Sequence, residues 1–409
     1  MTAGSTTVRA EEGTGLTGHR LLFFTLSLGA FAIGTDSMII SGLLGRIATG
    51  LHVSASAAGQ LVTVFAVVYA VAAPILAALT AQMERKTLLL SALGVFIVAN
   101  LLGAAAPSYP TLMAARVLAA LGAGLYLPNA MAVTVSISPK EQRGRAIAII
   151  AGGMSAAAAL GVPAGTLIGA LDSWRLTLLA VAVLSIVAAV ALLTGLPRVA
   201  PSAALTLSER LKAGAHPQVL IALLTNALMC AGEFTLFIYV APLASGLVGG
   251  GAVGLTGYLL LWGVTALVGS FLGGRAADAF GGRRSYAGAA SGVLLGVVAV
   301  AVLSVLRPAH GAGAAVVLGV LIVVIGVSSG VLPTAQNHRI SGIEGANSTV
   351  ALSLNGSSSY LGLAVAGAAG GAALAAGSLD ALCWTAVGFT TLALLVLGLA
   401  APRKATPAS

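Results

Sequence analysis

The chain has 409 residues, of which 58% are hydrophobic and only 8% are charged, and its formal net charge is +9. A soluble globular domain carries about 25% charged residues, so this composition excludes a soluble protein and indicates an integral membrane protein. The basic residues lie mostly in short hydrophilic breaks between apolar runs, as in loops on the cytoplasmic side of a membrane. We therefore do not expect nucleic acid as a partner.

Apolar runs of span length recur along the chain. A helix needs about 20 apolar residues to cross a bilayer. The sequence predicts twelve such helices, over 20–46, 55–81, 87–106, 110–135, 144–170, 175–196, 218–245, 252–277, 285–306, 311–333, 348–375 and 379–401. The first run has full span length, so we expect an uncleaved helix there rather than a cleavable signal.

The longest hydrophilic break divides the chain into near-equal halves. The predicted organisation is an N-terminal tail (1–19), a six-helix bundle (20–196), a linker (197–217), a second six-helix bundle (218–401) and a C-terminal tail (402–409). Both tails and the linker are expected to be cytoplasmic.

Landmarks repeat between the halves at a near-constant offset. Asp36 and Glu233 are 197 residues apart, and the Leu-Pro pairs at Pro128 and Pro333 are 205 apart. A duplicated unit of six spans keeps both copies parallel. We therefore predict an all-α membrane protein of two parallel-repeat six-helix bundles.

The distribution of Lys and Arg sets the expected orientation. With both termini inside, the inner segments hold sixteen of the 20 basic residues. The outer breaks hold three, Arg46, Arg175 and Arg307, and Arg116 lies within a span. The positive-inside rule then places both termini in the cytoplasm.

Two of the eleven acidic residues, Asp36 and Glu233, lie deep in predicted spans. A charge at the centre of a span costs about 2.5–3.5 kcal/mol, and such residues are functional by default. They can couple transport to protons or capture a cationic or polar substrate. The alternative is a carboxylate that only hydrogen-bonds a neighbouring helix.

Arg116 is the only basic residue well inside a predicted span. Its expected depth, about 9 Å below the outer surface, matches that of Asp36. A pair would make both charges tolerable, and protonating Asp36 would release Arg116. The alternative is a static structural pair.

A cavity for an amphiphilic small molecule is expected near Glu233. Asn226, Met229 and Phe237 lie on the same helical stripe as Glu233, although ordinary packing also accounts for the Met and Phe. Further intramembrane polar or aromatic candidates for this cavity are Tyr69, Tyr126, Asn129, Tyr258, Trp262, Asn355 and Tyr360.

Two further motifs suggest conformational roles. The fifth span carries small residues that allow close helix approach and a proline that can bend the helix, which indicates a hinge-like seam between the halves or simple tight packing. Its residues are Gly161, Pro163, Gly165 and Gly169. The loop after the eighth span can form a latch, or can set topology by charge alone. Its residues are Gly274, Asp278, Gly281 and Arg283.

Other function classes lack their signatures. Cys230 and Cys383 both lie in spans, and no metal-ligand spacing occurs. The five histidines share no motif, and no G-x-x-x-x-G-K-[ST] is present, so an enzyme or an ATP-driven pump is not expected. We expect no cofactor.

At these residues the sequence resembles the major facilitator superfamily. Within it, the sequence resembles the twelve-spanner drug:proton antiporter family, and in particular permeases of the chloramphenicol-resistance and arabinose-efflux type. The motifs are GTDSMIISG around Asp36, RVLAALGAG from Arg116, LGVPAGTLIG around Pro163 and GEFTLFIYVAP around Glu233. The loop after the second span departs from the family signature, with Ala81 in place of its Asp and Glu84 in place of its Gly.

The resemblance implies a proton-coupled exporter of small amphiphilic molecules, with Asp36 and Arg116 as its coupling pair. It implies multidrug or chloramphenicol-type efflux by alternating access in a bacterial cytoplasmic membrane. A sugar or nucleoside efflux permease and a non-transporting ligand sensor remain alternatives. The expected partners are protons, a small-molecule substrate and the lipid bilayer, and we expect a monomer.

Overall fold

The computed structural model describes residues 16–138, 143–171, 173–197, 199, 216–249, 252–306, 312–343 and 348–399, and these contain helices and no strands. The helices are α1 (Leu16–Gly50), α2 (Ala55–Leu79), α3 (Arg85–Ala104), α4 (Tyr109–Ile137), α5 (Arg143–Ala156), the π-helical η2 (Ala157–Gly161), α6 (Val162–Leu171), α7 (Trp174–Gly195), α9 (Pro217–Ile238), α10 (Val240–Val248), α11 (Ala252–Phe280), α12 (Gly282–Leu306), α13 (Ala312–Ser341), α14 (Ser348–Ala375) and α15 (Leu379–Leu399).

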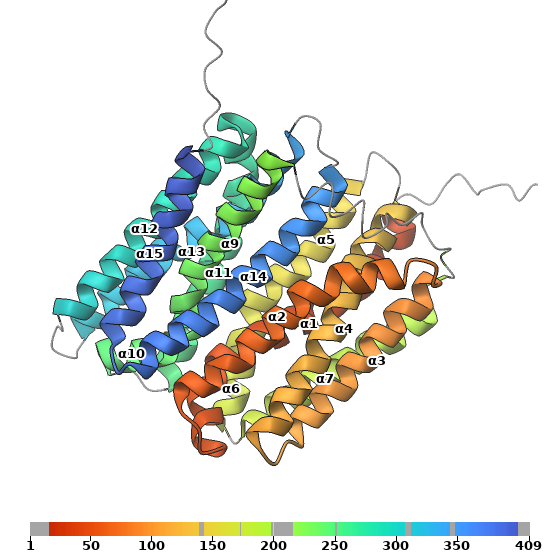
Figure 1. Ribbon diagram of the computed structural model, residues 1–409. Helices are drawn as coiled ribbons and strands as arrows, with labels where there is room; N and C mark the ends of the chain where they lie inside the picture. The colour runs from red at the N-terminus through yellow and green to blue at the C-terminus, as the bar shows by residue number, and fades with distance from the viewer. Residues whose placement is uncertain are drawn as a thin grey trace, which may run out of the picture.

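The described residues form twelve stretches long and apolar enough to span a membrane. Helices α1–α7 gather in one bundle and α9–α15 in a second, on the right and left of Figure 1. The predicted fold class is confirmed. We call the end where α7 stops and α9 starts the linker end, and the end where α1 stops and α2 starts the distal end.

Several predicted boundaries need correction. The helix α1 begins at Leu16, inside the predicted tail, and continues to Gly50. The seventh span is broken at Tyr239 into α9 and α10, and the tenth extends to Ser341. Hydropathy detects only the apolar part of a helix, so it misses polar helical ends. The predicted C-terminal tail, most of the N-terminal tail and most of the linker lie outside the described residues.

Short turns between helices are fixed by capping side chains and by glycines. The Ser54 hydroxyl accepts a hydrogen bond from the Ala57 amide at 3.1 Å, which caps α2. Gly281, with φ of 80°, separates α11 from α12, and Gly377, also at 80°, separates α14 from α15. Side chains rarely adopt this left-handed conformation, so glycine permits both tight turns.

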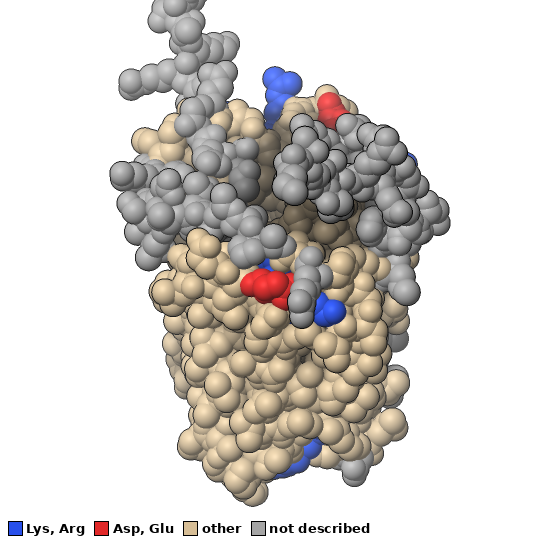
Figure 2. Space-filling model, turned by 90° about the vertical axis from the view of Figure 1, so that its right-hand side faces the viewer, with Lys and Arg blue, Asp and Glu red and all other residues tan. Residues whose placement is uncertain are grey.

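The two bundles meet closely toward the distal end. Ser56 Oγ on α2 donates to the Gly371 carbonyl on α14 at 2.7 Å, and Gln60 Nε2 donates to the Gly367 carbonyl at 3.3 Å. The face seen in Figure 2 is hollowed at the linker end. On that face an uncharged band separates the acidic and basic side chains near mid-height from the basic side chains at the bottom, as expected of a surface that faces lipid. The molecule is therefore closed distally.

Candidate functional site

A buried ion pair joins α1 to α4. Arg116 Nη1 lies 2.7 Å from Asp36 Oδ2, and Arg116 Nη2 donates to the Asp36 backbone carbonyl at 3.3 Å. Asp36 is 0% and Arg116 2% exposed. Asp36 Oδ1 and Arg116 Nε have no hydrogen-bond partner among the described residues. The pair therefore holds two opposite charges out of water and leaves one polar atom of each side chain without a hydrogen bond.

Three aromatic rings link this pair to the other bundle. The Arg116 guanidinium lies over the Phe65 ring, with Cζ 4.5 Å from its centroid. Tyr69 follows one turn later on α2, and its ring centroid lies 3.7 Å from that of Tyr360 on α14. The Tyr360 side chain also interacts with Ser37, next to Asp36. A residue of the second bundle therefore contacts the immediate surroundings of the ion pair.

Glu233 occupies a separate position in the second bundle. It is 7% exposed, and Ser329 Oγ on α13 donates to its Oε2 at 2.7 Å. One turn along α9, the Phe237 ring meets Trp262 of α11 edge to face, with centroids 5.1 Å apart. Met229 is 1% exposed and belongs to the large apolar core. A carboxylate one helical turn from a pair of aromatic rings suits a ligand with both polar and apolar parts.

A chain of amide side chains continues from this region toward the linker end. Asn226 Nδ2 donates to Ser358 Oγ at 2.9 Å and to Ser359 Oγ at 2.8 Å. Gln336 Nε2 donates to the Ala222 carbonyl at 2.8 Å and to Asn355 Oδ1 at 3.3 Å. The Gln336 side-chain oxygen is buried and has no partner in the described structure. This network offers hydrogen bonds in an otherwise apolar bundle.

Sequence reasoning missed Gln336, Ser329 and the Ser358–Ser359 pair. The signal was weak, because hydroxyls and amides are common in spans and their helix faces are unknown before folding. The position of Gln336 three residues after Pro333, beyond the predicted span end, hid it further. Asn226 and Asn355, by contrast, were predicted, and the structure brings them into one network.

Three predicted binding residues lie elsewhere. Tyr126 donates to the Leu26 carbonyl at 3.0 Å, inside the first bundle. Asn129 Oδ1 accepts a hydrogen bond from Arg85 Nη1 at 2.7 Å. A neutral amide does not balance the guanidinium charge, but it satisfies one of its donors. Tyr258 donates to the Ala315 carbonyl at 3.3 Å and ties α11 to α13. Each of these contacts lies within a single bundle, Tyr126 and Asn129 in the first and Tyr258 in the second, so the structure does not bring the three side chains together with Glu233.

The glycine motif of the fifth span packs within its own bundle. The nearest neighbours of Gly161, Gly165 and Gly169 include Thr35, Ile39 and Leu43, one residue per turn of α1. These glycines therefore allow close packing against α1 inside the first bundle, while the fifth span, as η2 and α6, also contacts α11 of the second bundle. At the contact with the second bundle, Gly263 of α11 packs against Ala158 and Ala159 of η2 too closely for a side chain.

Pro163 follows a π-helical turn. The Val162 amide bonds to the Ala157 carbonyl, five residues back, and Pro163 has no amide hydrogen to continue the ordinary ladder. Ala158 and Ala159, which lie next to Gly263 of α11, belong to this wide turn. The predicted bend is thus a π-helical turn located at the contact between the bundles.

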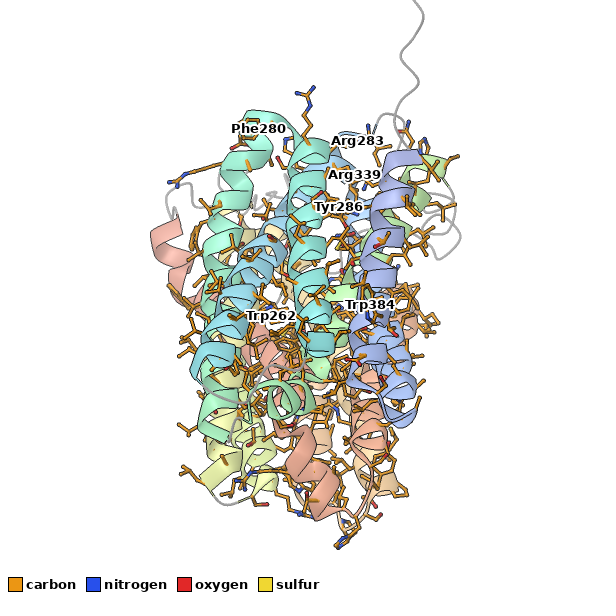
Figure 3. The ribbon with its side chains drawn as sticks, turned by 90° about the vertical axis from the view of Figure 1, so that its left-hand side faces the viewer. Trp262, Phe280, Arg283, Tyr286, Arg339 and Trp384 are labelled. Carbon is orange, nitrogen blue, oxygen red and sulfur yellow. The ribbon has the colours of Figure 1, made fainter. Side chains whose placement is uncertain are left out.

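The predicted latch residues lie at the linker end. Arg283 Nη2 donates to the Leu397 carbonyl near the end of α15 at 2.9 Å, so it binds a helix C-terminus. Asp278 is exposed, and a Cβ at Gly274 would meet nothing within 4 Å. Arg283, Arg339 and Tyr286 gather at this end of the second bundle, well above Trp262, in Figure 3.

The equivalent turn in the first bundle is organised by Glu84. Its carboxylate caps α3 by accepting from the Lys86 and Thr87 amides, and it also accepts from the Val199 amide at 3.2 Å. The hydrogen bond from the Thr87 hydroxyl, with these amides, lowers the pKa of Glu84 to about 2. The residue that departs from the family signature therefore anchors the start of the linker.

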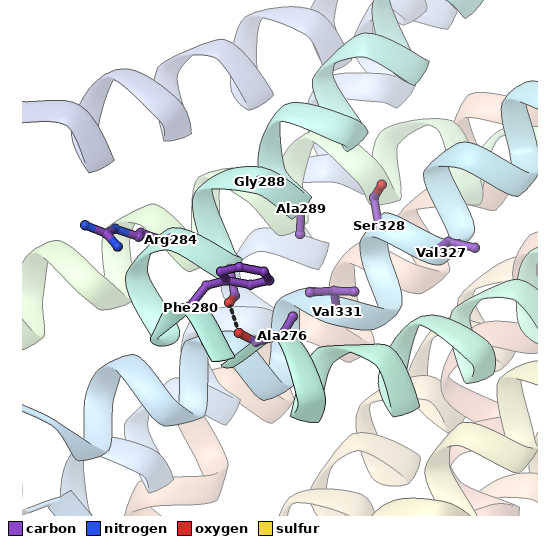
Figure 4. A pocket seen from close by; sticks show the side chains of 9 residues that line it. Ala276, Phe280, Arg284, Gly288, Ala289, Val327, Ser328 and Val331 are labelled. Atoms are coloured by element: carbon purple, nitrogen blue, oxygen red, sulfur yellow. Dashed lines mark hydrogen bonds between the residues drawn. The ribbon is translucent and has the colours of Figure 1, made fainter. Parts of the chain in front are cut away.

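Two cavities lie away from Asp36 and Glu233. One, of about 350 Å³, is bounded by Phe280, Arg284 and Val331 and is mostly apolar (Figure 4). The second, of about 600 Å³, lies at the distal end beside Arg46 and Arg175. Among the described residues, no group of three or more His, Cys, Asp or Glu could hold a metal ion.

Comparisons with known proteins agree with this architecture. Residues 26–343 match the family model described as Major Facilitator Superfamily. The chain is 32% identical to an uncharacterized MFS-type transporter, YbcL, of Bacillus subtilis over 366 residues, covering 88% of this chain and 90% of the relative. It is 34% identical to the inner membrane transport protein YdhP of Escherichia coli, covering 86% and 88% of the two chains.

A chloramphenicol resistance protein of Streptomyces lividans is 34% identical over 262 residues, 63% of this chain and 67% of that protein. Among solved structures, the nucleoside transporter NupG superposes with a TM-score of 0.73 at 11% identity, covering 93% and 99% of the two chains. A D-xylose-proton symporter superposes at 0.72 and 18% identity, covering 92% and 97%. At these identities the two structures support the fold alone.

Proposed function

We propose that this chain, which belongs to the Major Facilitator Superfamily and has the fold of its transporters, is a proton-coupled exporter of small amphiphilic molecules. The observation that carries the proposal is the buried Asp36–Arg116 pair in direct reach of Tyr360 from the other bundle. A proton-sensitive pair at the contact between two moving bundles is the arrangement that coupled transport needs.

The Lys and Arg distribution supports placing the linker end in the cytoplasm of a bacterial cell. The molecule is then closed toward the outside, by the α2–α14 contacts, and hollow toward the cytoplasm. This is the conformation in which an exporter loads substrate. Opening of the distal end requires those contacts to separate, which defines the alternating-access step.

Protonation of Asp36 triggers the conformational change in this mechanism. The neutral carboxyl no longer balances the Arg116 guanidinium, which stays charged in a protein. A buried charge left without its partner costs about 3–5 kcal/mol, so the bundle rearranges to give Arg116 other contacts. Inward proton movement provides about 2.3 kcal/mol per 100 mV, which is of the same order as the cost of the rearrangement.

The substrate region is proposed between Glu233, the Phe237–Trp262 pair and the amide network around Asn355. A ligand with an aromatic or alkyl part can pack against the two rings, and its hydrogen-bonding groups can pair with Glu233 and the amides. The similarity to a chloramphenicol resistance protein supports phenicol-like drugs as the first compounds to examine.

Drug-dependent proton movement in proteoliposomes tests the proposal. With protein inserted and a pH-sensitive dye inside, chloramphenicol or a cationic dye should drive proton flux in wild type and in the control Asp380→Asn, which changes the acidic residue in the first turn of α15. Asp36→Asn should bind drug but move no protons. Glu233→Gln should weaken drug binding. Drug binding without proton movement in wild type would refute coupling, and absence of any drug binding would refute the substrate class.

A further inference from the structure

Basic residues are scarce on the distal side of this chain, and two of them meet in one place. Of the 20 Lys and Arg residues, only Arg46, Arg175 and Arg307 belong to the distal breaks of the sequence. Arg46 and Arg175 line the same cavity of about 600 Å³. The positive-inside rule disfavours cations on this side, so two arginines converging on one cavity require an explanation beyond topology.

The cavity lies where both bundles meet. The end of α1, the helix α6 and the start of α7 form its walls from the first bundle. Ala241 of α10 and Leu255 of α11 complete it from the second bundle. The polar groups therefore come from the first bundle, and the second supplies an apolar cover. Separation of the bundles at the distal end would take the cavity apart.

The two arginines are held differently. Arg175 is half-buried: its Nη2 donates to the Ala106 carbonyl at 2.7 Å, and its Cζ lies 4.3 Å from the centroid of the Trp174 ring. Arg46 is exposed and makes no hydrogen bond or ion pair to the part of the chain that the structure describes. The Arg175 guanidinium is thus pre-oriented, and the Arg46 side chain can move toward a ligand.

Further donors lie in the cavity wall. Trp174 is 3% exposed, and its indole Nε1 has no hydrogen-bond partner among the described residues. A Cβ at Gly50, which also lines the cavity, would stand 3.0 Å from that nitrogen. The N-terminus of the 22-residue helix α7, capped by Ser173, adds its partial positive charge at the same place.

We propose that this cavity binds a phosphate-type oxyanion, from an outer-leaflet phospholipid headgroup or from free phosphate. Guanidinium groups bind phosphate oxygens through paired, charge-assisted hydrogen bonds. Trp174 is the first residue of the apolar span formed by α7, and aromatic residues are enriched at the ends of such spans, where they meet lipid headgroups. Because its walls come from both bundles, an occupied site favours the distally closed conformation over the open one. The site is independent of the proposed drug substrate.

Tryptophan fluorescence gives a local readout. The chain has three tryptophans, so the variant Trp262→Phe/Trp384→Phe leaves Trp174 as the only one. In detergent at fixed ionic strength, this protein is titrated with inorganic phosphate, with dihexanoyl phosphatidylglycerol and with dihexanoyl phosphatidylcholine. A saturable change with the anionic lipid alone assigns the headgroup as the source. A change with inorganic phosphate as well assigns the site to the free anion.

In either case Arg46→Gln should weaken binding about tenfold, the effect of losing one charge-assisted contact. Arg175→Gln should do the same, and Arg275→Gln, which removes an exposed charge at the other end, should not. No saturable response to either anion, or equal responses in all three variants, overturns the proposal. Asp172 directly precedes Ser173 in the sequence, so its carboxylate is the obvious internal competitor for the anion. A response that occurs only with Asp172→Asn also overturns the proposal, because that carboxylate would then occupy the anion's place.

Discussion

Replacing Asp36 by Asn should destabilise the folded protein strongly, because the change leaves Arg116 charged and without its carboxylate. The Arg116 side chain is 3% exposed and cannot reach water without a change in packing. Removing one partner of a buried ion pair costs about 3–5 kcal/mol. We therefore expect the free energy of unfolding to fall by about that amount, and to fall equally at pH 6 and pH 8.

Replacing Arg116 by Gln should behave differently, because the stranded Asp36 carboxyl can take up a proton. The folded state then holds a proton that the unfolded chain releases, so stability rises as the pH falls, by up to about 1.4 kcal/mol per pH unit. The double variant Asp36→Asn/Arg116→Gln buries two neutral amides of similar size. It should recover most of the stability that either single variant loses.

Chemical unfolding in detergent, followed by circular dichroism at pH 6 and pH 8, measures these differences. Arg275→Gln serves as the control, since that side chain is exposed. If the double variant lost the sum of the two single losses, the two charges would not be energetically coupled. If Arg116→Gln were equally stable at both pH values, the buried carboxyl would not be taking up a proton. Either result would refute the reasoning.

Three further outcomes are expected. A Cβ at Gly367 would lie 3.4 Å from Thr63 Cβ, close to the roughly 3.8 Å typical of disulfides. The double variant Thr63→Cys/Gly367→Cys, made in a background without the native cysteines (Cys230→Ala/Cys383→Ala), should therefore crosslink α2 to α14 on oxidation. Transport should stop and return with reductant, while either single cysteine variant is insensitive. Gly161→Ala should lower the free energy of unfolding by about 1–3 kcal/mol, because the new methyl group would overlap Thr35. The control Gly152→Ala should leave it unchanged, because a methyl group there meets nothing within 4 Å. Thermal unfolding compares the two variants. The pKa of Glu84 is lowered from 4.5 to about 2, so its cap on α3 is complete above pH 4.5 and is lost as the pH falls toward 2. Amide hydrogen exchange at Lys86 and Thr87, corrected for intrinsic rates, should therefore be constant from pH 5 to 8. It should be faster in Glu84→Ala, which lacks the cap.

The Asp36–Arg116 contact could be predicted from the sequence for a simple reason. Apolar spans hold few charges, so one deep cation and two deep carboxylates leave few possible pairs. Span number and fold class follow from the same contrast between apolar runs and polar breaks. These are properties of composition along the chain and do not depend on how helices rotate.

The surroundings of Glu233 could not be predicted in the same way. Its partner, Ser329, is one of many hydroxyls in the spans, and only the rotation and depth of α13 bring it to the carboxylate. The same holds for the glycine motif: Gly161 and Gly165 predict a close helix contact, but the sequence does not say that α1 is the neighbour. Small residues specify that two helices approach, and tertiary packing decides which.

The separation of the ion pair along the chain has a consequence for how the protein is made. Asp36 and Arg116 are 80 residues apart, so the carboxylate reaches the translocon well before its partner is synthesised. At about 5–20 residues per second, the interval is roughly 4–16 s. During that time α1 must stay near the translocon or carry a protonated Asp36. The first bundle therefore passes through a stage in which its buried carboxylate is unpaired, and this stage ends when α4 is made.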